Sequence, residues 1–269
     1  TTNISAILAG NTSILSMSGT GSLTMSASNT YAGGTTISAG TLVLGSSNSL
    51  ASAGAVTVSG GILSMGASSN TVGTVTVSSG SITSSSGVLT GSGYSISNDA
   101  GTVTISASLG SSGALTKTGS GILVLSGTNS SYSGVVTISA GTLSINGSNR
   151  LGSGTLALNG GTLSLATGAA DYTIANTIDL KNSSTVTNVG TTSVTFSGGV
   201  SSSKSNSTNV LTIDGNTAIN FSGIIADGAT SSKVLSIVQT SSATTTLSNA
   251  NTYSGGTTIQ TGATIAVSA

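Results

Sequence analysis

The sequence contains no cysteine, histidine, proline, tryptophan or glutamate, and these absences exclude several kinds of site. Without cysteine there is no disulfide framework and no thiolate metal site. Without histidine no side chain has an ordinary pKa near neutrality, and the usual Ser-His-Asp arrangement cannot be built. The common hydrolase and metalloprotein classes are therefore disfavoured.

Charge is also scarce. Five lysine or arginine residues and five aspartates make up 4% of the 269 residues, and the net charge is zero. A neutral chain has no electrostatic attraction for nucleic acid or for an acidic membrane surface. No apolar run approaches the length of a membrane-spanning helix, and Thr1 is not followed by a basic and then apolar leader. We expect no nucleic-acid binding and no membrane insertion, and we interpret the chain as mature material from which a signal peptide has been removed.

What the sequence does have is a glycine that recurs about every 20 residues. Successive members are 19, 21, 19, 21, 20, 20 and 20 residues apart. An aliphatic residue follows two places after each glycine, and another follows four places after it in seven of eight cases, with Ser84 as the exception. The glycines are Gly21, Gly40, Gly61, Gly80, Gly101, Gly121, Gly141 and Gly161.

This period, with alternation inside each copy, predicts an all-β, parallel β-solenoid with turns of about 20 residues. One turn cannot bury its own apolar face, but turns stacked about 4.8 Å apart can. Leu42 should then lie directly over Leu63, the glycines should form corners with positive φ, and serine and threonine should point outwards. A β-sandwich is disfavoured because it gives no reason to keep one phase through eight copies.

The register predicts a single domain over residues 1–269, with on the order of 13 turns. Regular turns cover 1–165, and residues 1–20 form the first of them. Residues 166–249 continue the solenoid with longer, polar corners such as Ser201–Asn209, and 250–269 hold a final repeat. Strand-like pieces in the looser part are Ile178–Leu180, Val194–Phe196, Leu211–Ile213, Ile219–Phe221 and Val234–Val238.

Three strings resemble the passenger-associated transport repeat of autotransporters: NTYAGGTTISAGTLVL (Asn29–Leu44), LTKTGSGILVLSGTN (Leu115–Asn129) and YTIANTIDL (Tyr172–Leu180). The first phrase returns at Asn129–Leu165 and at Asn251–Val267. The resemblance implies a right-handed parallel β-helix, export to the bacterial surface or the extracellular space, and a scaffold without catalytic residues. The family's C-terminal translocator is not in this sequence, so we expect a released or excised passenger, or a free-standing secreted protein built from the same repeat.

The acidic residues give no pattern typical of catalysis. A glycosidase needs two carboxylates a few ångströms apart, and no two aspartates are one turn of 20 apart. Asp171 and Asp179 can approach across a corner, but a solvated corner, or a partnership of Asp179 with Lys181, explains them better. The five aspartates are Asp99, Asp171, Asp179, Asp214 and Asp227.

Other sequence motifs for chemistry are also missing. No GxSxG elbow and no in-phase calcium repeat occur. Lys117 in LTKTGSG resembles a phosphate loop only superficially, since it precedes the glycines and no helix follows. We expect no enzyme activity, no catalytic residue, no cofactor and no metal.

Aromatic residues offer a weak case for sugar binding. Tyr31, Tyr132 and Tyr253 share one repeat position, so we expect them to fill one type of corner, with their hydroxyls reaching the surface. They are 101 and 121 residues apart, which is five or six turns and too far for one sugar-binding strip. The sequence favours a structural role for these tyrosines.

Outward threonines suggest another possibility. Thr57, Thr76 and Thr104, with Thr35–Thr36 nearby, could form a flat uncharged array that orders water and binds ice. Serine, alanine and asparagine interrupt these rows, which weakens the case, and a thermal-hysteresis assay would decide it.

Neither end of the sequence offers proline, a charge cluster or an amphipathic helix to cap a solenoid. We therefore predict an extracellular structural protein whose terminal turns stack head to tail into a filament, with itself as partner. Artificial truncation would explain the same ends without a polymer. The alternative function is an adhesin passenger that binds host or matrix glycans or proteins through the irregular corners of residues 166–249.

Overall fold

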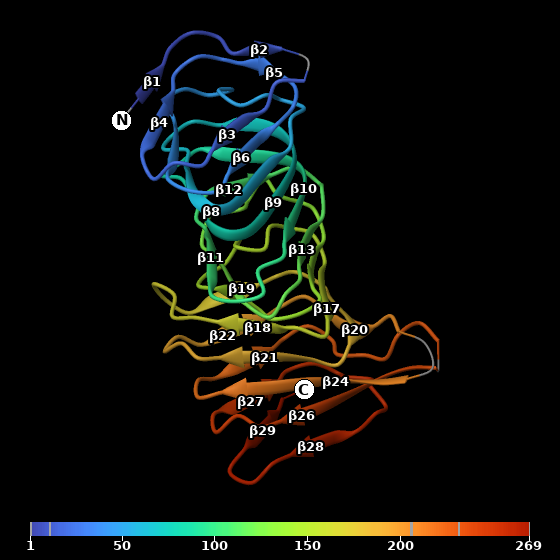
Figure 1. Cartoon of the computed structure of the whole chain (residues 1–269). Coiled ribbons are helices and arrows are strands. Elements are labelled where there is room, and N and C mark those ends of the chain that lie inside the picture. Colours follow the sequence, from blue (N-terminus) through green and yellow to red (C-terminus); the bar gives the residue numbers. More distant parts are fainter. Residues whose placement is uncertain (1, 11, 205–206, 231, 269) are drawn as a thin grey trace. The chain divides into compact units, whose positions relative to one another are not determined.

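The structure is a computed structural model that describes residues 2–10, 12–204, 207–230 and 232–268 (Figure 1). The described residues form strands joined by turns and bends and contain no helix. The chain divides into two compact units, unit 1 (residues 1–134) and unit 2 (residues 135–269), and each is described by itself. The single domain expected over 1–269 stays a prediction.

The described residues of unit 1 form fourteen strands in which valine, isoleucine, leucine and threonine dominate, as suits half-buried extended backbone. They are β1 (Thr2–Ile4), β2 (Ala9–Gly10), β3 (Leu15–Met17), β4 (Ser22–Met25), β5 (Thr30–Tyr31), β6 (Thr35–Ile37), β7 (Thr41–Leu44), β8 (Val56–Ser64), β9 (Asn70–Thr83), β10 (Val88–Ile96), β11 (Thr102–Ile105), β12 (Ser108–Gly110), β13 (Leu115–Lys117) and β14 (Ile122–Leu125).

Where the structure describes unit 2, it has fifteen strands, of which β22 and β25 have the bounds predicted from the sequence. They are β15 (Val136–Ile138), β16 (Thr142–Ile145), β17 (Leu156–Asn159), β18 (Thr162–Leu165), β19 (Tyr172–Ile174), β20 (Ile178–Asn182), β21 (Ser184–Asn188), β22 (Val194–Phe196), β23 (Val200–Ser202), β24 (Ser207–Gly215), β25 (Ile219–Phe221), β26 (Lys233–Gln239), β27 (Thr244–Leu247), β28 (Thr257–Ile259) and β29 (Thr264–Val267).

Strand pairing within each unit is parallel, and the paired strands come from successive turns of the chain. Turns of about 21 residues repeat about 12 times, which confirms the predicted β-solenoid. The first turn is present as expected, since Ile4 is in register with Met25. The corner at 201–209 is partly strand, and residues 205–206 of it lie outside the described residues.

The aliphatic residues form the predicted internal column. Leu42 is in register with Leu63, and Leu63 with Ile82, and all three side chains are fully buried. At Ile82 the register shifts by two residues, because its partner is Ile105 and not Val103. This shift accounts for the exception at Ser84, which lies past the end of β9 and uses its hydroxyl to bond Gly66 O at 2.7 Å.

The glycine column follows the prediction at only half of its positions. Gly40 has φ 69° and Gly80 has φ 86°, as a corner in the left-handed region requires. The prediction is wrong at Gly61, which lies at the same phase without a positive φ. A Cβ there would lie 2.6 Å from Ile37 Cγ2 and 2.7 Å from Gly40 O, so close packing requires the glycine. The repeat glycines with positive φ are Gly40, Gly80, Gly101 and Gly141.

Candidate functional site

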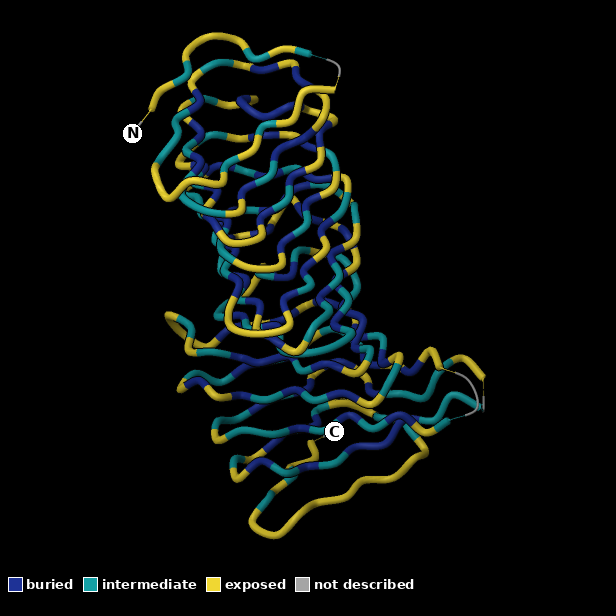
Figure 2. Tube along the Cα trace, viewed as in Figure 1, coloured by how far each residue is buried: buried dark blue, intermediate teal, exposed yellow. Residues whose placement is uncertain are grey.

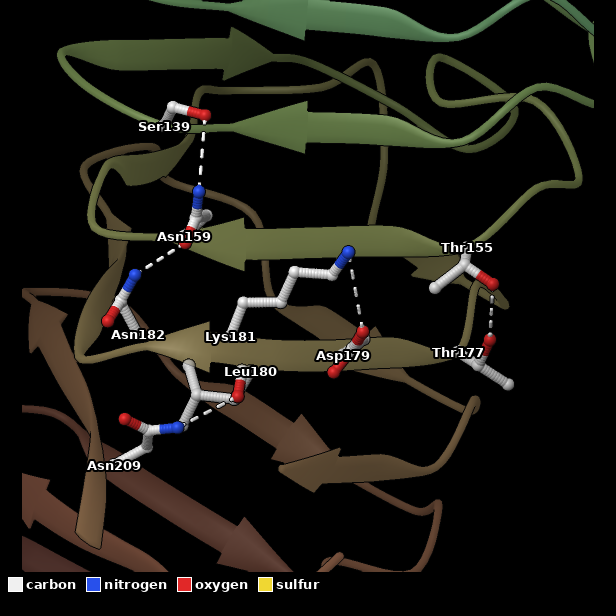
Figure 3. Close-up of polar contacts among 9 residues, drawn as sticks. All are labelled: Ser139, Thr155, Asn159, Thr177, Asp179, Leu180, Lys181, Asn182 and Asn209. Atoms are coloured by element: carbon white, nitrogen blue, oxygen red, sulfur yellow. Dashed lines mark hydrogen bonds and ion pairs between the residues drawn. The ribbon is translucent and has the colours of Figure 1, made fainter. Parts of the chain in front are cut away.

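The outward face of unit 2 has a row of polar side chains from consecutive turns with two amides at its centre, which we call the amide ladder (Ser139, Asn159, Asn182 and Lys204). Lys204 Nζ donates to Asn182 Oδ1 at 2.5 Å, and Asn182 Nδ2 donates to Asn159 Oδ1 at 2.5 Å. Asn159 Nδ2 then donates to Ser139 Oγ at 3.4 Å. Figure 3 shows Asn159 between Ser139 and Asn182. Every bond points the same way along the stack, from the ammonium towards the hydroxyl.

The strand ends position the amide ladder. Asn159 is the last residue of β17 and Asn182 the last of β20, and these two residues are in register despite an irregularity after Leu158. The extra residue in β20 allows Lys181 to turn towards Asp179, at 4.0 Å from its Oδ2, with side chains 47% and 24% exposed (Figure 3). A pair this exposed contributes little to stability. The expected partnership of Asp179 and Lys181 is therefore found.

Three other aspartates, Asp171, Asp214 and Asp227, accept hydrogen bonds from residues elsewhere in the chain. Asp171 Oδ1 accepts a hydrogen bond from Ser193 N at 2.8 Å, and Asp214 Oδ1 accepts one from Thr240 Oγ1 at 2.9 Å. Asp227 accepts bonds from the backbone of Leu235 and Ser254; burial raises its pKa, but these hydrogen bonds outweigh that effect and lower it overall. Among the described residues, no three acidic side chains cluster closely enough to hold a metal ion.

Lys117 points into unit 1 and is fully buried. Its Nζ donates to Thr118 O at 2.6 Å and to Gly119 O at 2.7 Å, so it caps the corner carbonyls that follow β13. Burial lowers the pKa of Lys117, and the negative charge of Asp99 opposes that shift. In unit 2, Gln239 also caps a corner carbonyl, because its Nε2 donates to Ala243 O at 3.2 Å. Interior donors of this kind satisfy the backbone carbonyl groups of corners, which a buried aliphatic side chain cannot do.

The prediction for the tyrosines is wrong in part. Tyr31 and Tyr132 do fill corners, but their hydroxyls lie inside and not at the surface. Tyr31 Oη bonds Thr35 Oγ1 at 2.6 Å, and Tyr132 Oη donates to Gly113 O at 2.9 Å. A buried hydroxyl needs a partner, and these corners supply one locally. Tyr253, in unit 2, is only half-buried.

Asparagines that link successive turns were not predicted as functional. Asn29 Oδ1 accepts from Leu8 N at 2.7 Å, one turn before it, and Asn29 Nδ2 donates to Ser49 O at 2.5 Å, one turn after it. The same position bonds the preceding turn again at Asn129 and Asn251. The signal was available, because an asparagine opens each copy of the repeated phrase.

The outward threonines of unit 1 form a continuous row on one face. Thr36, Thr57 and Thr76 are in register on β6, β8 and β9. Two details of the prediction are wrong: Thr35 is buried, since the alternation directs it inwards, and Thr104 is on β11, in register with Val124 in a different row. The alanine and asparagine expected to interrupt the row are absent from it.

The first and last described turns are hollowed, and the hollow in the first is lined mainly by apolar residues. In unit 1 a cavity of about 330 Å³ is lined by Ile4, Leu8, Ile14 and Tyr31 among others. In unit 2 a cavity of about 560 Å³ includes Val267 in its lining. Figure 2 shows the last turn of unit 2 as largely exposed, and β28 and β29 form its edge.

The passenger-associated-transport-repeat family model matches residues 15–44, 39–65, 115–145 and 237–267. These matches confirm the resemblance stated from the sequence and include the strings at Asn29–Leu44 and Leu115–Asn129, whereas the string at Tyr172–Leu180 lies outside them. No curated protein and no solved structure matches the chain. The residues that the structure describes include no helix long and apolar enough to cross a membrane.

Proposed function

We propose that this chain, which carries four passenger-associated transport repeats on a β-solenoid and so fits an autotransporter passenger-type protein, is a non-enzymatic structural component outside the cell. The repeat family suggests a secreted or cell-surface location. The observation that supports a structural role best is the unbroken stacking of buried columns. Buried polar groups such as Lys117 and Asn29 are used to hold turns and corners together.

The finer proposal is a filament formed by head-to-tail stacking of turns. The edge of a parallel stack has unpaired backbone groups that can pair with another turn. In unit 1 Ile14 is 64% exposed, and in unit 2 Ile259 and Val267 are 51% and 75% exposed. Apolar residues at both such edges support association through them, and the near absence of charge leaves little repulsion between copies.

Negative-stain electron microscopy over a range of protein concentrations tests the filament. We expect fibres that lengthen with concentration, and their loss when Ile259→Lys and Val267→Lys are combined. The matched control is Val189→Lys, which changes a 59% exposed valine in a corner of unit 2 away from that edge. Isolated short particles at every concentration would contradict the filament while leaving the repeat scaffold intact.

The alternative proposal is adhesion to a glycan through the polar surface of unit 2. Seven of the ten charged residues fall between residues 171 and 233, and the amide ladder lies on the same unit. Amide and hydroxyl groups in a row suit the hydroxyls of a sugar chain. A glycan array should then give binding that is lost in Asn182→Ala and kept in Thr173→Ala, an exposed substitution on β19. The seven residues are Asp171, Asp179, Lys181, Lys204, Asp214, Asp227 and Lys233.

A further inference from the structure

One outward face of unit 1, the hydroxyl face, presents a hydroxyl from each of six consecutive turns in direct register. Every strand pair along this row is parallel, and no residue other than serine or threonine occupies it. The row reads Ser16, Thr36, Thr57, Thr76, Ser95 and Thr116.

A second, less regular row of hydroxyls lies beside the first, because the residue two places further along the chain is again serine or threonine, although four of these six residues lie just past the ends of their strands. A buried side chain, such as Ile37 or Val58, lies between the two outward positions. A register shift after Val58 pairs Ser59 with Ser79, which is also a hydroxyl residue. The second row reads Ser18, Ser38, Ser59, Ser78, Ser97 and Thr118.

The hydroxyls of the first row are available to an external partner. Within the part of the chain that the structure describes, Thr36, Thr57 and Thr76 make no side-chain hydrogen bond, whereas serines in the corners, such as Ser84 and Ser111, bond backbone carbonyls. The three threonines are half-buried, so neighbouring turns restrict their rotamers while their hydroxyls face solvent.

The surroundings exclude most classes of ligand. Asp99 and Lys117 are the only charged residues in the sequence of unit 1, and Lys117 is fully buried, so an ionic ligand has little to bind. The tyrosines of unit 1, Tyr31, Tyr94 and Tyr132, are buried, so no ring is presented for stacking on a sugar. A regular array of hydroxyls without charge or aromatic rings fits a partner that is itself a regular lattice of hydrogen-bonding groups.

The hydroxyls of this face repeat at regular distances in two directions, as the groups of a lattice do. Turns repeat about every 4.7–4.9 Å along the stack, and alternate residues of a strand are about 6.7 Å apart. We propose that the hydroxyl face of unit 1 binds the surface of ice, with the threonine methyl groups and hydroxyls holding a layer of ordered water between them. This activity is separate from filament formation, which uses the terminal turns.

Thermal hysteresis and the capture of protein into a slowly growing ice hemisphere test the proposal. The intact protein should shape ice crystals and enter the ice, and Thr57→Lys and Thr76→Lys should each lose most of both activities. The matched control is Thr104→Lys, which puts the same charge on another outward, half-buried threonine of unit 1 and should keep both. Circular dichroism melting of each variant checks that the fold is retained.

Three results would overturn the proposal: an intact protein that is excluded from ice, equal losses in the Thr57 and Thr104 variants, or binding of crystalline cellulose or chitin in place of ice. Thr57→Val adds a test of the chemistry, since it keeps the shape and removes the hydroxyl. A smaller loss than with Thr57→Lys is expected, because valine keeps the methyl group of threonine that packs against the water layer.

Discussion

Leu63 and its neighbour Ile62 offer a matched test of the packing. The two are adjacent in β8, yet Leu63 is fully buried and Ile62 is 39% exposed, because successive side chains of a strand point to opposite faces. Leu63 lies between Leu42 and Ile82 in the internal column. Truncation to alanine removes methyl groups from the column and leaves a cavity that its neighbours cannot fill.

We expect Leu63→Ala to lower the free energy of unfolding by about 2–5 kcal/mol, as for a buried leucine in a close-packed core. Ile62→Ala should cost about 0.5 kcal/mol or less, as for an outward position. Urea denaturation followed by circular dichroism measures both. The double variant Leu42→Ala with Leu63→Ala should depart from additivity by about 0.5–3 kcal/mol, because the two side chains are in register. Equal decreases in the free energy of unfolding for Leu63→Ala and Ile62→Ala would refute the assignment of inward and outward positions.

Three further predictions concern polar groups. Asn29→Ala removes the bonds to Leu8 N and Ser49 O, and should lower the free energy of unfolding by about 1–3 kcal/mol in the same denaturation assay, with no effect contradicting a role in linking turns. The pKa of Lys117 is lower in the folded than in the unfolded protein. The free energy of unfolding should therefore rise as the pH increases from the pKa of the folded state towards the unfolded value of about 10.4. Urea denaturation at a series of pH values should show this rise, and it should vanish in Lys117→Met. Burial raises the pKa of Tyr172 to about 12, so its contribution to the free energy of unfolding is fully present below about pH 10 and is lost as the pH rises through about 12. Urea denaturation at a series of pH values should show that this loss disappears in Tyr172→Phe.

The fold was largely predictable because the spacing of apolar residues in the sequence equals the number of residues in one turn, so residues one period apart stack on each other. Leu42 over Leu63, the first turn at residues 1–20 and the strands at Val194–Phe196 and Ile219–Phe221 were all found as expected. The shift that pairs Ile82 with Ile105 was not predicted, because a shift of two residues keeps the same faces in and out and leaves the alternation unchanged.

The surfaces were harder to predict than the core. The stacking partners of outward residues depend on the length of each corner. Thr104 therefore lies in a different row from Thr57, although both are threonines in strands with the same alternation of apolar and polar residues. The sequence predicts that serines interrupt the threonine array, yet Ser16 and Ser95 continue the row of hydroxyls. The inward hydroxyl of Tyr132 depends on Gly113 O, a partner 19 residues away that no local pattern indicates.

The central claim is that residues one turn apart lie side by side in parallel register, and a disulfide tests it directly because the chain has no cysteine of its own. Thr57 and Thr76 are in register, and neighbouring strands are about 4.7–4.9 Å apart, within the Cα separation that a disulfide spans. Intact mass after thiol alkylation should show that Thr57→Cys with Thr76→Cys oxidises to an intramolecular disulfide, while Thr57→Cys with Thr104→Cys keeps two free thiols. Two free thiols in the first variant, or a disulfide formed as readily in the second, would contradict the stacking of turns.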